Sequence, residues 1–244
     1  MNSADLSKIL EEHKVWITSM RESGSRANLC DANLCGADLR GANLCDANLC
    51  GANLCDANLC DTNLRGADLC DANLCGANLC GANLCDANLC DTNLCGANLC
   101  DANLCDTNLR GADLCDANLC GANLCGANLC DANLCDTNLR GADLYGANLC
   151  GADLYGADLY GADLPDLTFV ILGEKYFISI TNGEYVRAGC QNHTVEEWRK
   201  YSKQEITEMD GRKALKFYPR LLSIIDFYLG AGEWPDWVKS DGEE

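Results

Sequence analysis

The chain is poor in several residue types that would point to familiar classes of protein. Its 244 residues include two histidines, three prolines, three methionines and four phenylalanines. The sequence contains no apolar run long enough to cross a membrane, and its first residues lack the basic and apolar regions of a signal peptide. We therefore expect a cytoplasmic protein with no membrane contact, whose cysteine thiols are reduced.

Positive charge is also scarce, since 18 Lys and Arg stand against 37 Asp and Glu. The net charge of −19 disfavours direct binding to nucleic acid or to an anionic membrane surface. Cysteine, by contrast, is abundant, at 21 residues. This content is typical of short secreted disulfide scaffolds. However, 20 of the cysteines lie between Cys30 and Cys150 at positions that are multiples of five, which indicates a repeat.

A five-residue repeat fills residues 27–166 without a break. Its 28 copies follow the pattern A-[N/D]-L-x-[D/G], except that the first position is threonine at Thr62, Thr92, Thr107 and Thr137. The third position is leucine in every copy. A period of five fits neither a helix nor a flat strand, and Asn, Asp and Gly favour turns. We therefore expect a coil with one corner per pentad and with Ala and Leu inside. The fourth position is mostly Cys, the exceptions being Arg40, Arg65, Arg110, Arg140, Tyr145, Tyr155, Tyr160 and Pro165.

This tandem A-[D/N]-L-x-x motif resembles the pentapeptide-repeat proteins over all 140 residues. The resemblance implies an all-β solenoid, a right-handed quadrilateral β-helix with four pentads per coil and one pentad on each face. Twenty-eight pentads would then form about seven coils. The resemblance also implies that Leu and Ala fill the interior, while the fourth and fifth positions face solvent.

Residues 1–26 are predicted to form an N-terminal helical cap on the first coil. The pattern predicts a helix over residues 4–20, with Ser3 as N-cap and with His13 packed on its apolar stripe. The segment L…EEHKVWI…SGSRANL resembles the leader of many bacterial and phage pentapeptide-repeat proteins. A cap is needed because an open β-helix end would invite edge pairing.

Residues 167–244 break the period and are predicted to form a small α+β module that caps the last coil or binds a partner. Thr168–Leu172, Tyr176–Thr181 and Glu184–Ala188 are predicted strands, the last two joined by a turn at Asn182-Gly183. Thr194 and Ser202 each open a capping box. A further helix is expected over about 211–229, bent at Pro219 and ended by Gly230.

We find no constellation of residues that indicates an enzyme, a catalytic residue or a cofactor. Cys190 and His193 form a C-x-x-H pair, but two ligands do not make a zinc site and no orienting residue is evident. We interpret the pair as part of a loop beside a helix.

The repeated cysteines have three interpretations. In the first, they are surface residues (filler) with no specific role. In the second, they form strained disulfides between successive coils. In the third, they bind a soft metal or act in redox chemistry. If the fourth position faces outward, they stack in columns with one residue every 20. A straight column offers collinear sulfurs rather than a tetrahedral set, and we expect ordinary thiol pKa values near 8.5. The candidate thiol column contains Cys35, Cys55, Cys75, Cys95, Cys115 and Cys135.

The repeat also carries 20 Asp against 4 Arg, a charge density close to that of duplex DNA. Some pentapeptide-repeat proteins protect DNA gyrase by imitating DNA, but these aspartates are spread evenly over the four faces. We therefore expect a non-enzymatic structural or protein-interaction protein, with an unknown partner that binds through the C-terminal module. The alternatives are a thiol-based soft-metal or redox binder and an acidic DNA mimic acting on a topoisomerase such as DNA gyrase. The sequence leaves monomer and dimer undecided.

Overall fold

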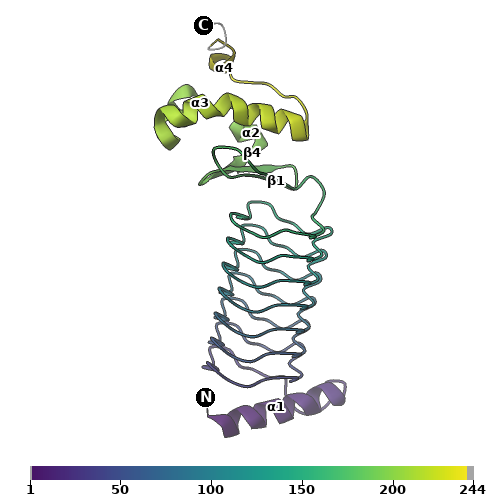
Figure 1. The fold of residues 1–244 in the computed structure, drawn as a ribbon. Coiled ribbons are helices and arrows are strands. Elements are labelled where there is room, and N and C mark those ends of the chain that lie inside the picture. Colours follow the sequence, from purple (N-terminus) through teal and green to yellow (C-terminus); the bar gives the residue numbers. More distant parts are fainter. Residues whose placement is uncertain (1, 241–244) are drawn as a thin grey trace. The chain divides into compact units, whose positions relative to one another are not determined.

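The structure is a computed structural model that describes residues 2–240. The chain divides into two compact units, Met1–Pro165 and Asp166–Glu244 (Figure 1). The first unit contains helix α1 (Ser3–Thr18) and the pentads. The second contains β1 (Phe169–Ile171), β2 (Ile178–Thr181), β3 (Tyr185–Ala188), β4 (Gln191–Thr194), α2 (Val195–Trp198), α3 (Lys203–Leu229) and α4 (Asp236–Ser240). We call residues 27–165 the solenoid and residues 166–240 the C-terminal module.

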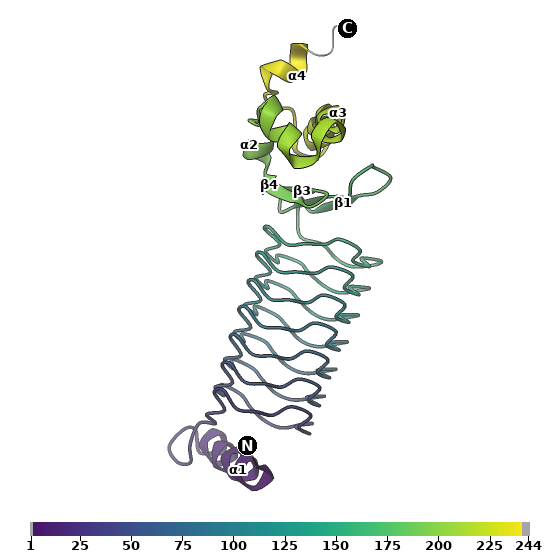
Figure 2. The same cartoon turned by 90° about the vertical axis from the view of Figure 1, so that its left-hand side faces the viewer.

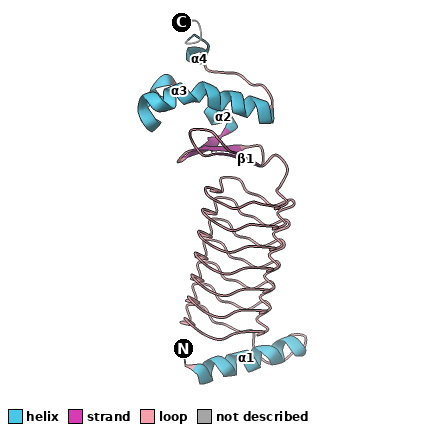
Figure 3. Cartoon of the chain, in the orientation of Figure 1, coloured by secondary structure: helices cyan, strands magenta, loops and turns pink. Residues whose placement is uncertain are grey.

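The solenoid is a stack of coils that each take four pentads (Figure 2). Parallel bridges join the second position of each pentad to the residue 20 positions further on, from Asn28↔Asn48 to Asp143↔Asp163. Each bridge is a single residue pair, so the solenoid is drawn as loop rather than as strand (Figure 3). The four-pentad coil agrees with the expectation from the sequence, while the sides of the coil are isolated bridges rather than regular strands.

Every backbone N–H of a typical pentad has an acceptor, as in residues 47–51. The first-position N–H donates to a third-position carbonyl in the preceding pentad (3.0 Å), which closes the corner. The N–H groups at the second, third and fifth positions donate to neighbouring coils over 3.0, 2.7 and 2.9 Å. The fourth-position N–H donates to the side-chain oxygen of Asn48 (3.1 Å). The Asn or Asp at the second position thus supplies the one acceptor that the backbone does not.

The fifth position is Asp or Gly because its backbone is left-handed. From Asp31 to Gly161, φ is between +54° and +59° at the aspartates and between +62° and +75° at the glycines. Glycine adopts this conformation without steric strain, and Asp and Asn tolerate it better than other residues. The D/G alternation in the sequence is therefore a conformational requirement of the corner.

The interior of the solenoid is a column of leucine and alanine. All third-position leucines from Leu29 to Leu154 are at most 3% exposed. The four first-position threonines are also buried, and each donates its hydroxyl to a leucine carbonyl 23 residues earlier, as Thr62 does to Leu39 (3.0 Å). The hydroxyl groups of these buried threonines therefore all have hydrogen-bond partners.

Helix α1 packs against the first coil through His13. The helix is N-capped by Asn2, whose Oδ1 accepts from the N–H of Asp5 (2.8 Å), so the prediction of Ser3 as N-cap was wrong by one residue. His13 is fully buried, and its Nδ1 accepts from the N–H of Ala27 (3.0 Å). Burial lowers the pKa of His13 and keeps the ring neutral. His13 is thus the hydrogen-bonded packing residue that joins the cap to the first pentad.

The C-terminal module contains one antiparallel sheet in the order β1-β2-β3-β4. The three predicted strands are present with shorter ends, and Asn182 and Gly183 form the expected turn with φ of +51° and +70°. The interpretation of Cys190–His193 as a loop was wrong for residues 191–193, because β4 covers Gln191–Thr194 and pairs with β3, while Cys190 lies in the turn between the two strands. These four residues are polar and do not alternate with apolar residues, so the sequence pattern does not indicate a strand. The segment is a strand because its backbone pairs with β3.

Helices cover one face of this sheet. Both predicted capping boxes are present, and Ser202 starts α3 at Lys203. The non-helical residues Asp210 and Gly211 inside α3 lie where the further helix was expected to begin. Pro219 lies inside α3, and Gly230 follows its last residue. The sheet and helices share a core that contains Ile178, Ile180, Val186, Trp198, Ile206, Tyr218, Leu221, Leu222, Ile224, Ile225 and Val238. Among residues 2–240, no helix has the length and apolar character that a membrane span requires.

Candidate functional site

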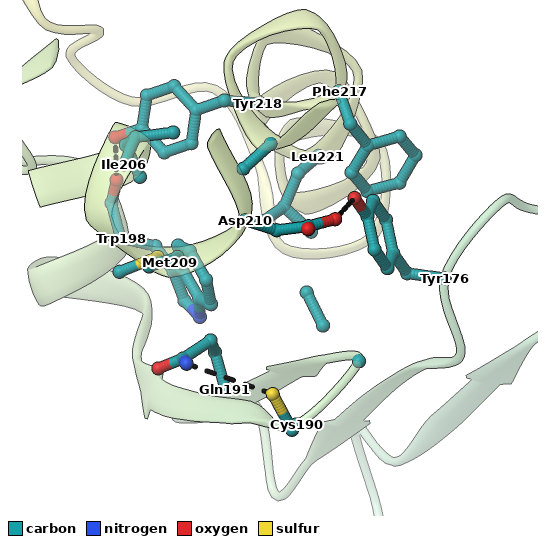
Figure 4. Close-up of a pocket in the computed structure, with 13 residues that line it drawn as sticks. Tyr176, Cys190, Gln191, Trp198, Ile206, Met209, Asp210, Phe217, Tyr218 and Leu221 are labelled. Atoms are coloured by element: carbon teal, nitrogen blue, oxygen red, sulfur yellow. Dashed lines mark hydrogen bonds between the residues drawn. The ribbon is translucent and has the colours of Figure 1, made fainter. Parts of the chain in front are cut away.

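The C-terminal module contains a mostly apolar pocket of about 350 Å³ (Figure 4). One wall comes from the turn between β3 and β4, one from α2, and the longest from α3. The volume is near the lower end of the range of about 300–1,000 Å³ that is usual for ligand sites. The side chains labelled in Figure 4 are Tyr176, Cys190, Gln191, Trp198, Ile206, Met209, Asp210, Phe217, Tyr218 and Leu221.

A break in α3 places a carboxylate on this pocket. Asp210 (φ −152°) and Gly211 (φ +58°, ψ −141°) leave the helical conformation, although helix continues on both sides. The Tyr176 hydroxyl donates to Asp210 Oδ2 (2.5 Å), and the ring packs edge-on against Phe217 at 5.0 Å. Burial and this carboxylate raise the pKa of Tyr176 to about 12, so the phenol is a donor at neutral pH.

Sequence analysis missed both Tyr176 and Asp210 as site residues. The Asp-Gly dipeptide inside a helical pattern was the available signal, because this pair favours turns. Tyr176 carried no signal of its own, since it lies 34 residues away from its partner.

The C-x-x-H pair does not form a joint site. Cys190 lines the pocket, and its sulfur accepts from Gln191 Nε2 (3.8 Å). His193 bonds to Gln191 Oε1 (3.2 Å) and packs edge-on against Trp198 and Tyr201, with ring centroids 5.1 and 5.2 Å away. The histidine is therefore part of an aromatic cluster in the module.

The repeated cysteines are half-buried rather than fully exposed. Between Cys45 and Cys150 they are of intermediate exposure, apart from the buried Cys90, while Cys30 and Cys35 in the first coil are exposed. All 21 cysteines are thiols. Many donate to the carboxylate of the next residue, as Cys55 does to Asp56 (3.5 Å) and Cys115 to Asp116 (3.4 Å). The fourth position therefore faces outward but is covered by its neighbours in adjacent coils.

At many of these positions the surroundings raise the pKa of the thiol, and for those residues this corrects the expectation of a value near 8.5. Loss of hydration, the bond to Asp56 and the nearby carboxylate raise the pKa of Cys55 to about 11. The same causes raise the pKa of Cys115 to about 11 and that of Cys70 to about 12. Each effect disfavours the thiolate, because a second negative charge next to aspartate is unfavourable.

We expect the solenoid thiols with raised pKa values to react slowly with disulfide reagents in the native protein. These thiols include Cys55, Cys100, Cys105 and Cys115. A rise in pKa from 9.0 to about 11, as for Cys100 and Cys105, lowers the thiolate fraction at pH 8 about 100-fold. Stopped-flow titration with 4,4′-dithiodipyridine, in buffer and in urea, measures this difference. The native rates of these thiols should rise about tenfold per pH unit up to pH 11. Equal rates for them in both solvents would contradict the prediction.

The described part of the chain holds no group of three or more His, Cys, Asp or Glu side chains arranged to bind a metal ion. This finding covers tetrahedral sites of the zinc type, which need four ligands or three and a water. The candidate column from Cys35 to Cys135 brings its sulfurs together only as successive neighbours along the solenoid.

Comparison with known proteins identifies the repeat. The family model for pentapeptide repeats matches residues 25–59, 37–74, 82–119, 112–149 and 131–164, which together are more than half of the chain. A search of curated protein sequences finds no match.

Several solved structures are similar to the chain. HetL from the cyanobacterium Nostoc sp. strain PCC 7120, involved in regulating heterocyst differentiation, is 39% identical, with 58% of this chain and 74% of HetL covered and a TM-score of 0.40. A protein from the thylakoid lumen of Arabidopsis thaliana is 36% identical, with 42% and 71% covered and a TM-score of 0.41. The plasmid-mediated fluoroquinolone resistance protein QnrB1 is 22% identical, with 55% and 79% covered and a TM-score of 0.33.

The matched residues coincide with the four-pentad coils, and the left-handed corners and leucine core explain why the motif repeats. On these grounds the chain belongs to the family of pentapeptide repeat proteins.

Proposed function

We propose that this chain is a non-enzymatic interaction protein in which the C-terminal module binds a partner. The observation that carries this proposal is the mostly apolar pocket between the β3–β4 turn and α3. The solenoid supports an interaction role because its repeated corners and its hydrogen-bonded backbone make a regular scaffold. We take its coils to be right-handed and quadrilateral, about seven in number, as membership of the family implies.

The chemistry of the pocket supports a proposal for the kind of partner. Its walls of Trp198, Met209 and Phe217 suit an apolar side chain, which would anchor a peptide segment. Asp210 lies at the same site and carries a negative charge in a chain whose net charge is −19. Complementary charge favours a Lys or Arg next to the anchor in the partner. We therefore infer a protein segment with an apolar anchor beside a basic residue.

Selection from a random peptide library by the full-length protein tests this function. Enriched peptides should combine an apolar anchor with a neighbouring Lys or Arg. Ala214→Phe, which fills the pocket from α3, should weaken their binding at least tenfold. Leu172→Ser is the matched control, because Leu172 is 85% exposed and does not line the pocket.

Thermal melting of both variants separates loss of binding from loss of folding. A folded Ala214→Phe protein that retains full affinity would show that the pocket is not the binding site. Enriched peptides with no basic residue would contradict the role of Asp210.

A further inference from the structure

The fourth position is the one place in the pentad where neither the core nor the backbone selects the side chain. The first and third positions are buried, the second supplies a hydrogen-bond acceptor, and the fifth must be left-handed. Arg, Tyr and Pro all occupy the fourth position in this chain, so its geometry tolerates many residues. Cysteine nevertheless occupies it in 20 of the 28 pentads. Packing and backbone conformation therefore do not account for the recurrence of cysteine.

Fourth-position side chains touch each other from one coil to the next. Arg110 Nη2 donates to Cys90 Sγ over 3.4 Å, and the guanidinium of Arg140 lies 4.7 Å from the ring centre of Tyr160. Both pairs are 20 residues apart, which is the spacing of the bridges. Side chains at this position therefore form continuous columns along the solenoid.

The same adjacency holds for the thiols. Cys95 lies close enough to Cys75 and Cys115, and Cys55 close enough to Cys35 and Cys75, for these neighbours to affect its pKa. The column from Cys35 to Cys135 is therefore an unbroken series of six neighbouring thiols, which ends where Tyr155 occupies the next rung.

The spacing of this column matches one mode of metal coordination. Parallel bridges hold the backbones of successive coils about 4.8 Å apart, which is the usual spacing of paired strands. Two metal–sulfur bonds as long as a Zn–S bond, about 2.3 Å each, would span about 4.6 Å when arranged end to end. We propose that neighbouring thiols 20 residues apart bind a monovalent soft ion such as Cu(I) in a linear, two-coordinate S–Cu–S unit. In the column from Cys35 to Cys135 the six sulfurs form three such sites.

Linear coordination agrees with the donor set better than the alternatives do. Tetrahedral zinc sites need three or four donors that converge, and the described residues hold no such group. Soft thiolates select Cu(I), which accepts two ligands. Binding converts two thiols and one Cu⁺ into one anionic Cu(SR)₂⁻ unit and releases two protons, so that atoms and charge balance and no oxidant is required. This site lies in the solenoid and is independent of the function proposed for the C-terminal module.

The test uses full-length variants that contain equal numbers of thiols in different arrangements. In the parent variant, every cysteine outside the column is replaced by serine, which leaves the six thiols from Cys35 to Cys135. An alternating variant then changes Cys55, Cys95 and Cys135 to Ser and leaves no neighbours. A contiguous variant changes Cys35, Cys55 and Cys75 to Ser and leaves three neighbours. Circular dichroism confirms that all three proteins are folded before Cu(I) is added under anaerobic conditions against a competing chelator.

We expect three bound Cu(I) ions in the parent, one in the contiguous variant and none in the alternating variant. X-ray absorption should show two sulfur ligands per ion. Equal binding by the two three-thiol variants would overturn the proposal, because it would mean that single thiols bind independently. Three or more sulfur ligands per ion would also overturn it.

The dependence of affinity on pH provides a second readout. Because two protons leave for each ion, the affinity should rise about 100-fold per pH unit below the pKa values of the thiols. The charged groups that face this column include Asp56, Asp113 and Asp116. A tenfold rise per pH unit would indicate one thiolate per ion and would contradict the linear pair.

Discussion

A variant in which valine replaces the twelve fifth-position aspartates from Asp31 to Asp136 is expected not to fold. These residues have φ between +54° and +59°, a conformation that is strained for a β-branched side chain. The strain is about 1–2 kcal/mol per residue, or about 12–24 kcal/mol in total. Typical domains are stable by only about 5–15 kcal/mol. Far-UV circular dichroism and size-exclusion chromatography would show an unfolded or aggregated chain.

The matched variant replaces the same twelve aspartates with asparagine. Asparagine tolerates the left-handed region as well as aspartate does, so this protein should fold although it has lost twelve negative charges. A folded valine variant would refute the conformational explanation. An unfolded asparagine variant would show instead that the carboxylates are required, for example as acceptors for thiols such as Cys55.

Truncation of one central leucine should have the largest effect of any single substitution in the solenoid. Leu99 is completely buried, and Leu99→Ala is expected to lower the free energy of unfolding by about 2–5 kcal/mol. The loss combines the removed apolar contacts with the cavity that remains, because the hydrogen bonds to both neighbouring coils prevent the corner from collapsing inward. Urea denaturation followed by circular dichroism measures the change.

Cys100→Ala is the neighbouring control for this measurement. Cys100 is the next residue along the chain but lies outside the leucine core, so its truncation should change the stability by less than about 1 kcal/mol. Comparable losses from Leu99→Ala and Cys100→Ala would mean that the outer thiols carry as much of the packing as the core does.

The acidic composition of the solenoid has a structural cause. Twelve of the aspartates occupy left-handed corners, where glycine is the alternative. Others occupy the second position, where Asp68, like asparagine, accepts the N–H of the residue two places later (3.3 Å). The net charge of −19 thus follows in large part from which residues the corner and the turn accept.

Much of the solenoid could be predicted from the sequence because the pentad is a local rule. The buried leucines, the turn-forming Asn and Asp and the two capping boxes all follow from side chains that act within a few residues of themselves. The four-pentad coil came from the family resemblance, and the bridges agree with it. Helix α1 was also predicted, although its N-cap was placed one residue too late.

The tertiary structure alone decided the properties that depend on distant neighbours. The pKa values of thiols such as Cys55 and Cys70 are raised for two reasons. Side chains in the adjacent coils, 20 residues before and after, shield the thiol from water, and the next residue is an aspartate. The pocket joins Tyr176 to Asp210 across 34 residues, and β4 exists because β3 pairs with a polar segment. The sequence by itself determined the repeat, because the residue type at most pentad positions is set by the conformation and burial of that same pentad. The thiol columns and the pocket required the fold, because burial and charge depend on which residues the coils and strands bring together.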